Sequence, residues 1–200
     1  MGTIALVILC YAIGSLSFAV IVSRACGLPD PRTYGSGNPG ATNVMRSGKK
    51  AAAALTLFGD GAKGWIAVYL AQVLAPHWGV AEVGVAMAAL AAFLGHLFPV
   101  FFSFKGGKGV ATAAGILLAL NVWMGLAVLV TWIAVFALSR ISSLSALTAA
   151  ASAPVYAAYL LDKPMLLTVI VLSALLIWRH RSNIRNLLQG KEGSFKKAEE

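Results

Sequence analysis

The sequence predicts an all-α, polytopic integral membrane protein, a bundle of about seven transmembrane helices. The first observation is composition: 59% of the 200 residues are hydrophobic, only 12% are charged, and the mean hydropathy is +0.81. Soluble globular domains carry roughly 25% charged residues. The second observation is that apolar stretches approaching the roughly 20 residues of a membrane span follow one another almost without a break. Together these observations exclude a soluble enzyme or binding domain.

Seven apolar segments are expected to form the helices. The fourth is separated from the fifth only by Asn121, so it is predicted to be a short or broken helix. The first lacks the basic start of a signal peptide and is long enough to span, which indicates a retained helix. We interpret residues 1–190 as one membrane domain and residues 191–200 as a polar tail. The segments are 3–23, 51–75, 80–99, 107–120, 121–138, 143–161 and 164–178.

The distribution of basic residues predicts the orientation. The chain has 16 Lys and Arg against 7 Asp and Glu, a formal charge of +9. If the N-terminus is outside, nearly all basic residues fall in the cytoplasmic connections 24–50, 100–108 and 139–142 and in the cytoplasmic C-terminal tail. The opposite connections contribute only Lys163, as the positive-inside rule requires. The excess of basic residues also indicates attraction to anionic headgroups or to an anionic substrate. It is only weak evidence for binding to nucleic acid.

The first cytoplasmic connection is rich in hydrogen-bond donors. Residues 34–46 read Tyr-Gly-Ser-Gly-Asn-Pro-Gly-Ala-Thr-Asn-Val-Met-Arg. Glycine N–H groups can form an anion nest, hydroxyls and amides donate further bonds, and Arg46 offers a bidentate charge to a phosphate. An ordinary polar loop would explain a lone Gly-Ser-Gly, but the density of donors around one arginine favours a site.

A charged pair lies inside the second apolar segment, in Gly59-Asp-Gly-Ala-Lys-Gly64. Asp60 is about 14 Å along a helix that begins at Ala51. The spacing of three places Asp60 and Lys63 on one face, and charges at that depth are costly unless they face protein or water. A structural ion pair is one interpretation. The flanking glycines are expected to leave space for something to approach, which favours a functional pair.

The third cluster runs from Gly95 to Thr112 and includes Phe-Lys-Gly-Gly-Lys-Gly at 104–109. It predicts a helix broken at Pro99, then an aromatic interface and a glycine-rich basic turn that opens the next helix. Two lysines and two glycine N–H groups at a helix N-terminus would form a phosphate cradle. The turn is not a Walker loop, because Gly109 stands where a Ser or Thr would hold magnesium. A positive-inside anchor explains the lysines but not the glycines.

The last cluster combines Arg140-Ile-Ser-Ser-Leu-Ser145 with Arg179-His-Arg-Ser-Asn-Ile-Arg185. His180 and Asn183 are three apart, so on a continuing helix they share a face and could reach one ligand. A basic juxtamembrane tail is the alternative interpretation. All four clusters fall on the cytoplasmic side of the expected topology, which predicts one anion site at that interface.

These blocks resemble the signature sequences of the bacterial membrane glycerol-3-phosphate acyltransferases that use acyl phosphate, the PlsY family. The resemblance is carried by residues 35–46, 60–64, 95–112 and 179–184, in the family's order and over nearly the whole chain. It implies an inner-membrane enzyme that transfers a fatty acyl group from acyl phosphate to the 1-hydroxyl of glycerol 3-phosphate. The products would be lysophosphatidic acid and inorganic phosphate, in phospholipid synthesis.

The clusters and the resemblance together give the candidate site. The catalytic candidates are His180, Asn183, Ser143, Lys105, Ser36 and Arg46. The candidates for substrate and phosphate binding are Gly37, Asn38, Gly40, Thr42, Asn43, Asp60, Lys63, His96, Gly106, Gly107, Lys108 and Thr112.

The expected chemistry needs neither an acyl-enzyme nor a cofactor. The chain has no Gly-x-Ser-x-Gly elbow, and Cys10 and Cys26 lack an activating partner, so direct attack by the glycerol hydroxyl is expected. His180, His96 or the donor's phosphate would take the proton. The expected partners are the two substrates and the bilayer, without metal or nucleic acid, and neither acyl carrier protein nor coenzyme A is needed as the direct donor. One alternative is an organic-anion or phosphate transporter, which would favour inverted repeats and a midplane site, and the other is a non-catalytic lipid-binding scaffold.

Overall fold

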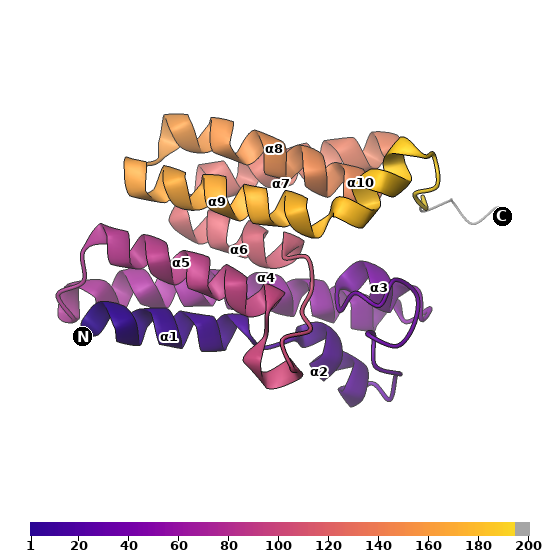
Figure 1. Cartoon of the computed structure of the whole chain (residues 1–200), viewed down its shortest axis with the longest axis horizontal. Coiled ribbons are helices and arrows are strands. Elements are labelled where there is room, and N and C mark those ends of the chain that lie inside the picture. The colour runs from indigo at the N-terminus through magenta and orange to yellow at the C-terminus, as the bar shows by residue number, and fades with distance from the viewer. Residues whose placement is uncertain (195–200) are drawn as a thin grey trace.

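The computed structural model describes residues 1–194, and these residues form helices and connecting segments without a β-strand. Figure 1 shows the longer helices running side by side along one long axis. The helices are α1 (Gly2–Gly14), α2 (Phe18–Ala25), α3 (Ala41–Met45), α4 (Lys50–His77), α5 (Glu82–Leu97), the 3-10 turn η1 (Val100–Phe102), α6 (Val110–Leu120), α7 (Val122–Ser139), α8 (Ser142–Leu160), α9 (Lys163–Arg179) and α10 (Arg181–Leu188).

The seven predicted apolar segments all correspond to helices. The first is divided into α1 and α2, which are bent by 41° at the break. As expected, the fourth is a short helix, α6, and α5 ends just before Pro99. Within the described residues, two helical segments, 82–102 and 122–139, are long and apolar enough to cross a membrane on their own. The count rises to four if each of two bent helix pairs is one span.

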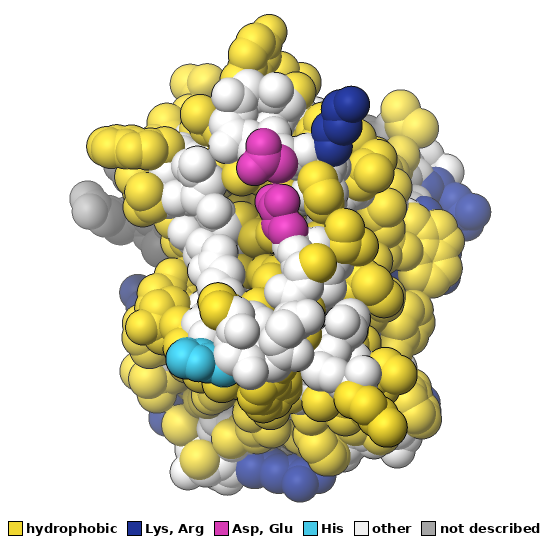
Figure 2. Space-filling model, turned by 90° about the vertical axis from the view of Figure 1, so that its left-hand side faces the viewer, with side chains coloured by type: hydrophobic (Ala, Val, Ile, Leu, Met, Phe, Trp, Pro, Cys, Tyr) yellow, Lys and Arg dark blue, Asp and Glu magenta, His cyan; other side chains and the backbone are white. Residues whose placement is uncertain are grey.

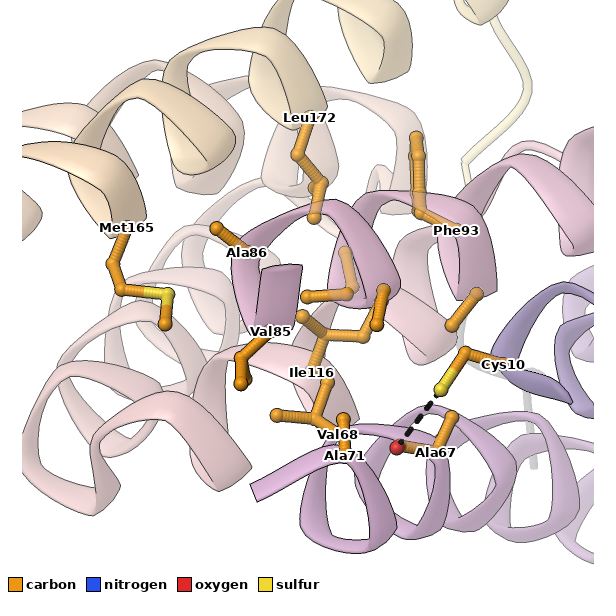
Figure 3. Close-up of a cluster of buried hydrophobic side chains, with 14 of the residues drawn as sticks. Cys10, Ala67, Val68, Ala71, Val85, Ala86, Phe93, Ile116, Met165 and Leu172 are labelled. Atoms are coloured by element: carbon orange, nitrogen blue, oxygen red, sulfur yellow. Dashed lines mark hydrogen bonds between the residues drawn. The ribbon is translucent and has the colours of Figure 1, made fainter. Parts of the chain in front are cut away.

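The main core lies between α1, α4, α5, α6 and α9. Figure 3 shows Phe93 and Leu172 approaching this core from α5 and α9, with Ile116 of α6 between α4 and α5. Cys10 Sγ lies 3.3 Å from the carbonyl oxygen of Ala67, so the thiol is buried between α1 and α4. Both cysteines are free.

Glycines bring several helices into close contact. A Cβ atom at Gly64 would lie 2.4 Å from the Thr112 carbonyl oxygen, and one at Gly115 would lie 1.9 Å from the Gly61 carbonyl oxygen. These positions therefore allow the backbones of α4 and α6 to approach, as small residues do between membrane helices. At Gly59 a Cβ would meet the Phe18 ring at 2.2 Å. The expectation that the glycines flanking Asp60 and Lys63 leave space for a ligand is wrong at Gly59 and Gly64, because protein fills the space there.

The two ends of the bundle differ in charge. Figure 2 shows the end from which α1 starts, where acidic side chains gather on a largely apolar and uncharged surface. Glu82 begins α5 and Asp162 precedes α9 at this end. The other end carries α2, α3, α10 and the turn before α6 (Figure 1). The four sequence clusters meet at this second end, so the fold brings together segments that are far apart in the chain.

Candidate active site

A cavity of about 710 Å³ opens among α3, α6, α8, the start of α10 and the segment after it. This size is within the range of small-molecule sites. Most of the predicted site residues line it: Ser36, Asn38, Gly40, Thr42, Asn43, Arg46, Asp60, His96, Lys108, Ser143, His180 and Asn183. The other predicted residues are not part of the lining: Gly37, Lys63, Lys105, Gly106, Gly107 and Thr112.

Two helix N-termini face the polar part of this cavity. Gly109, Val110 and Ala111 line it at the start of α6, and Ser142 and Ser143 line it at the start of α8. The first N–H groups of a helix have no partner within the helix and carry a partial positive charge. Gly109 has φ +90°, and its Cβ would lie 2.2 Å from the Phe93 ring, so a glycine is required where α6 begins. The arrangement favours an anionic ligand.

A hydrogen-bonded chain crosses the polar part of the cavity. The Lys108 ammonium donates to Oδ1 of Asn183, and Nδ2 of Asn183 donates to Glu192 over 2.6 Å. Ser143 Oγ donates to the same Glu192 carboxylate oxygen, also over 2.6 Å. Burial lowers the pKa of Lys108. Burial alone would raise the pKa of Glu192, but hydrogen bonds from Ser143 and Asn183 hold it below its usual value.

Glu192 is a site residue that the sequence did not indicate. It was expected to belong to a featureless polar tail, yet residues 192–194 fold back and line the cavity. Residues 195–200 of that tail lie outside the described part of the chain. A single glutamate between Lys191 and Gly193 carries no local signal, and its partners are 9 and 49 positions away.

The buried pair in α4 belongs to a network with α5 and α6. Lys63 Nζ lies 2.7 Å from Asp60 Oδ1, 2.5 Å from the Leu16 carbonyl oxygen and 2.9 Å from His96 Nδ1. Thr112 Oγ1 is 3.1 Å from the same histidine nitrogen. Asp60 and Lys63 are 3% and 2% exposed. Because ammonium groups only donate, Nδ1 of His96 accepts and the neutral ring carries its proton on Nε2.

The glycine-rich turn before α6 is held by side chains of other helices. Arg179 donates from Nε to the Gly107 carbonyl oxygen over 3.1 Å and from Nη2 to that of Gly106 over 2.9 Å. The Gly107 N–H donates to the His96 carbonyl oxygen. A Cβ at Gly107 would lie 2.4 Å from His96 Nε2. These glycines therefore allow tight packing around His96. The expectation that the N–H of Gly107 binds phosphate is wrong, because this N–H already donates to His96.

The first loop is organised around Asn43. Its Nδ2 donates to the carbonyl oxygens of Pro31 and Tyr34, and its Oδ1 accepts from the Ser36 N–H. Asn43 therefore shapes the loop, while Ser36 and Arg46 stay exposed at the cavity. Arg46 forms no ion pair with any residue from 1 to 194. Its charge is available to a ligand.

His180 lies at a helix break, not inside a continuing helix. The condition of one continuing helix through 179–185 is not met, because α9 ends at Arg179 and α10 starts at Arg181 at an angle of 59°. His180 and Asn183 nevertheless both line the cavity. His180 Nδ1 lies 2.8 Å from the Leu176 carbonyl oxygen. A carbonyl can only accept, so Nδ1 carries the proton and Nε2 is the acceptor of the neutral ring.

Below the polar groups the cavity continues as an apolar arm between α6, α7, α8 and α9. Buried alanines of α6 and α8 face larger residues of α7 and α9 there, and Ser173 adds a hydroxyl. The arm and the polar part form one continuous space. Such a shape fits an amphipathic molecule with an anionic head and an apolar chain. An integral membrane fold with this site fits the class of membrane proteins that bind phosphorylated lipids.

Comparison with known proteins identifies the family within that class. The model of the glycerol-3-phosphate acyltransferase family matches residues 4–190, and the chain belongs to that family. A glycerol-3-phosphate acyltransferase of Ralstonia nicotianae is 61% identical over 192 residues, which cover 96% of this chain and 93% of the relative. One of Nitrosomonas eutropha is 59% identical over 193 residues, covering 96% of each chain.

Solved structures agree with the family assignment. The crystal structure of PlsY (YgiH), an integral membrane glycerol 3-phosphate acyltransferase, in its glycerol 3-phosphate form matches with a TM-score of 0.90. It is 38% identical and covers 98% of this chain and 96% of that one. The lysophosphatidic acid form matches with a TM-score of 0.88 at 37% identity, with the same coverage. The chain is thus a glycerol-3-phosphate acyltransferase of the PlsY type.

Proposed function

We propose that this enzyme transfers a fatty acyl group from acyl phosphate to the 1-hydroxyl of glycerol 3-phosphate, at the cytoplasmic face of a bacterial inner membrane. The observation that carries the proposal is the single cavity in which a basic polar part joins an apolar arm. Acyl phosphate has a phosphate head and an apolar chain, so it matches both parts. The related PlsY structures with glycerol 3-phosphate and with lysophosphatidic acid support the acceptor and the product.

Two phosphate groups explain why the polar part has so many donors. Lys108, Arg46 and the N-termini of α6 and α8 offer positive charge, and Ser36, Thr42 and Asn38 offer further hydrogen-bond groups. Lys105 is exposed on the turn before α6, and in the proposed complex its long flexible side chain reaches a bound phosphate. Charge stabilisation of a leaving phosphate is the main contribution expected from such a site.

The transfer step requires no acyl-enzyme. The glycerol hydroxyl oxygen attacks the acyl carbonyl carbon and forms the ester bond. The bond from that carbon to the bridging phosphate oxygen breaks, and its electron pair leaves with inorganic phosphate. The hydroxyl proton passes to a base and ends on the phosphate product. Positioning of the two substrates in one cavity supplies much of the rate enhancement.

The hydrogen bonds distinguish the two histidines as proton acceptors. Nδ1 of His96 is already engaged by Lys63 and Thr112, so the neutral ring has no free acceptor. Nε2 of His180 has no hydrogen bond with any residue from 1 to 194, and the side chain lines the cavity. Of the two histidines, His180 is therefore the preferred base. The donor's own phosphate is the other candidate.

A donor comparison tests the proposed function. Purified enzyme in detergent should convert glycerol 3-phosphate and acyl phosphate to lysophosphatidic acid, with little product from acyl-CoA or acyl carrier protein. No three His, Cys, Asp or Glu side chains among residues 1–194 form a group suited to a metal ion. We therefore expect turnover to continue in a strong chelator, measured by product mass spectrometry. Robust turnover with acyl-CoA, or complete loss on chelation, would contradict the proposal.

Cysteine labelling tests the orientation. Lys49 and Lys163 are both exposed but lie at opposite ends of the bundle, so Lys49→Cys and Lys163→Cys form a matched pair. A background with Cys26→Ser is suitable, since Cys10 is buried. In intact spheroplasts a membrane-impermeant thiol reagent should label position 163 and leave position 49 unmodified until the membrane is opened. Labelling of position 49 from outside would reject both the topology and a cytoplasmic site.

A further inference from the structure

We propose that the closed deep end of the apolar arm sets the acyl-chain length that the enzyme prefers, and that Ala153 of α8 is the residue that determines its depth. The proposal rests on the proposed function, because it takes the acyl chain of the donor as the occupant of the arm. That occupant follows from continuity: the arm opens directly into the polar part that holds the phosphate-binding groups.

One face of α8 forms a long wall of the arm. The helix lines the cavity at Ser142 and Ser143, and then at Ala146, Ala149, Ala150 and Ala153. This spacing of three and four residues is one side of a helix. From Ser142 to Ala153 the wall extends roughly 16 Å at the helical rise of about 1.5 Å per residue. Alanine has the smallest side chain after glycine, so these positions leave the arm wide.

The arm is closed immediately beyond Ala153. Ala153, Leu117 and Val128 line the deep end, and all three are buried. They pack in one cluster with Met124 and Ala157, which do not line the cavity. One helical turn below Ala153 the bundle is therefore solid protein. A chain that reaches this floor must stop there or bend.

A second route exists for a chain that is too long. Leu57 of α4 and Ile133 of α7 line the cavity and are also 56% and 59% exposed on the outer surface. The cavity thus has a side opening toward lipid between α4 and α7. Lipid tails are as apolar as leucine, so transfer from bilayer to arm provides little hydrophobic selectivity. Chain-length preference must come from the fit against the closed end, where overpacking is unfavourable.

Enlarging the residue at the floor tests the proposal. Ala153→Leu adds a branched side chain that points into the deep end, whereas Ala151→Leu adds the same side chain on the exposed side of α8. Purified variants would be given glycerol 3-phosphate with an equimolar mixture of 10- to 18-carbon acyl phosphates. We expect Ala153→Leu to shift the product toward shorter chains by at least roughly ten-fold in the ratio of 12- to 16-carbon product, a typical value for a methylene that does not fit. Ala151→Leu should match the wild type.

A deepened arm provides the opposite change. Leu117→Ala removes bulk from the same floor and should shift the product toward longer chains. This second variant keeps the proposal testable if Ala153→Leu does not fold. An unchanged product distribution in a folded Ala153→Leu enzyme would overturn the proposal, and would indicate that the chain leaves through the opening beside Leu57 and Ile133. Failure of the wild type to use any acyl phosphate would instead reject the proposed function.

Discussion

Lys63→Ala should nearly abolish activity and strongly destabilise the protein. Lys63 is the ion-pair partner of Asp60, at 2.7 Å, and both side chains are almost completely buried. Removing one partner of a buried ion pair leaves an uncompensated charge and typically costs about 3–5 kcal/mol. The variant also loses the ammonium that holds His96 by its Nδ1. We expect at least a roughly 100-fold lower kcat/KM, because a displaced His96 would disturb Gly107 and the turn that carries Lys108.

The matched control is Lys163→Ala. Lys163 is exposed at the opposite end of the bundle and begins α9, so its removal should change neither activity nor thermal stability appreciably. Activity would be measured on detergent-purified, monodisperse protein, and stability as Tm without substrate. Full turnover by a folded Lys63→Ala enzyme would contradict the expectation.

A double replacement separates folding from function. In Asp60→Asn combined with Lys63→Met neither charge remains, and replacing both members of a buried pair is often neutral for stability. Tm should therefore recover relative to Lys63→Ala, while activity should stay low, since Lys63 no longer orients His96. If activity recovers together with Tm, the pair is structural only.

The sequence predicted the helices and the end of the bundle at which the site lies. Apolar runs identify membrane helices because the bilayer core offers no water as a hydrogen-bond partner. A span must therefore be helical and predominantly apolar along its whole length. The clustering of basic residues on alternate connections then placed 34–46, 104–109, 140–145 and 179–185 on one side of the membrane. These signals lie within single segments or depend only on which side of the membrane each connection occupies. They do not depend on contacts between helices.

Contacts between helices were not predictable in the same way. The glycines at 59–64 indicated an open space, but Phe18 and Thr112 occupy it. The N–H of Gly107 was assigned to phosphate, but His96 accepts it. Each of these partners comes from another helix, and apolar periodicity does not specify which helices meet.

The turn at His180 and the position of Glu192 also had no sequence signal. Neither proline nor glycine marks the break between α9 and α10, although such residues cause most sharp helix bends. Glu192 was assigned to the tail because the segment after Gly190 is polar. Its hydrogen bonds to Ser143 and Asn183 exist only because α8 and α10 meet at the cavity.

Asn183→Asp should reduce kcat/KM by roughly 10² to 10³, the usual effect of removing one donor from a charge-stabilising site. The amide of Asn183 accepts from Lys108 through Oδ1 and donates to Glu192 through Nδ2. An aspartate can still accept from Lys108, but it brings a carboxylate oxygen against the carboxylate of Glu192. Repulsion between the two carboxylates should disrupt the chain of hydrogen bonds. The added negative charge would also oppose binding of phosphate, so KM for glycerol 3-phosphate should rise.

The pH dependence of this variant distinguishes its charge from its shape. Two adjacent carboxylates raise each other's pKa, so the pair takes up one proton more readily than either group alone. The bound proton restores a donor between positions 183 and 192 and removes one negative charge. Activity of Asn183→Asp relative to the wild type should therefore increase as the pH falls from about 8 to 6.

The control for the change in charge is Asn121→Asp. Asn121 caps α7 at the opposite end by accepting from the Met124 N–H over 3.1 Å, and aspartate is an equally good cap. Its activity should equal that of the wild type at every pH. A constant ratio of Asn183→Asp to wild-type activity across this pH range would mean that carboxylate repulsion is not the cause of the loss. Full activity in Asn183→Asp would show that the bond between Asn183 and Glu192 does not position the phosphate-binding groups.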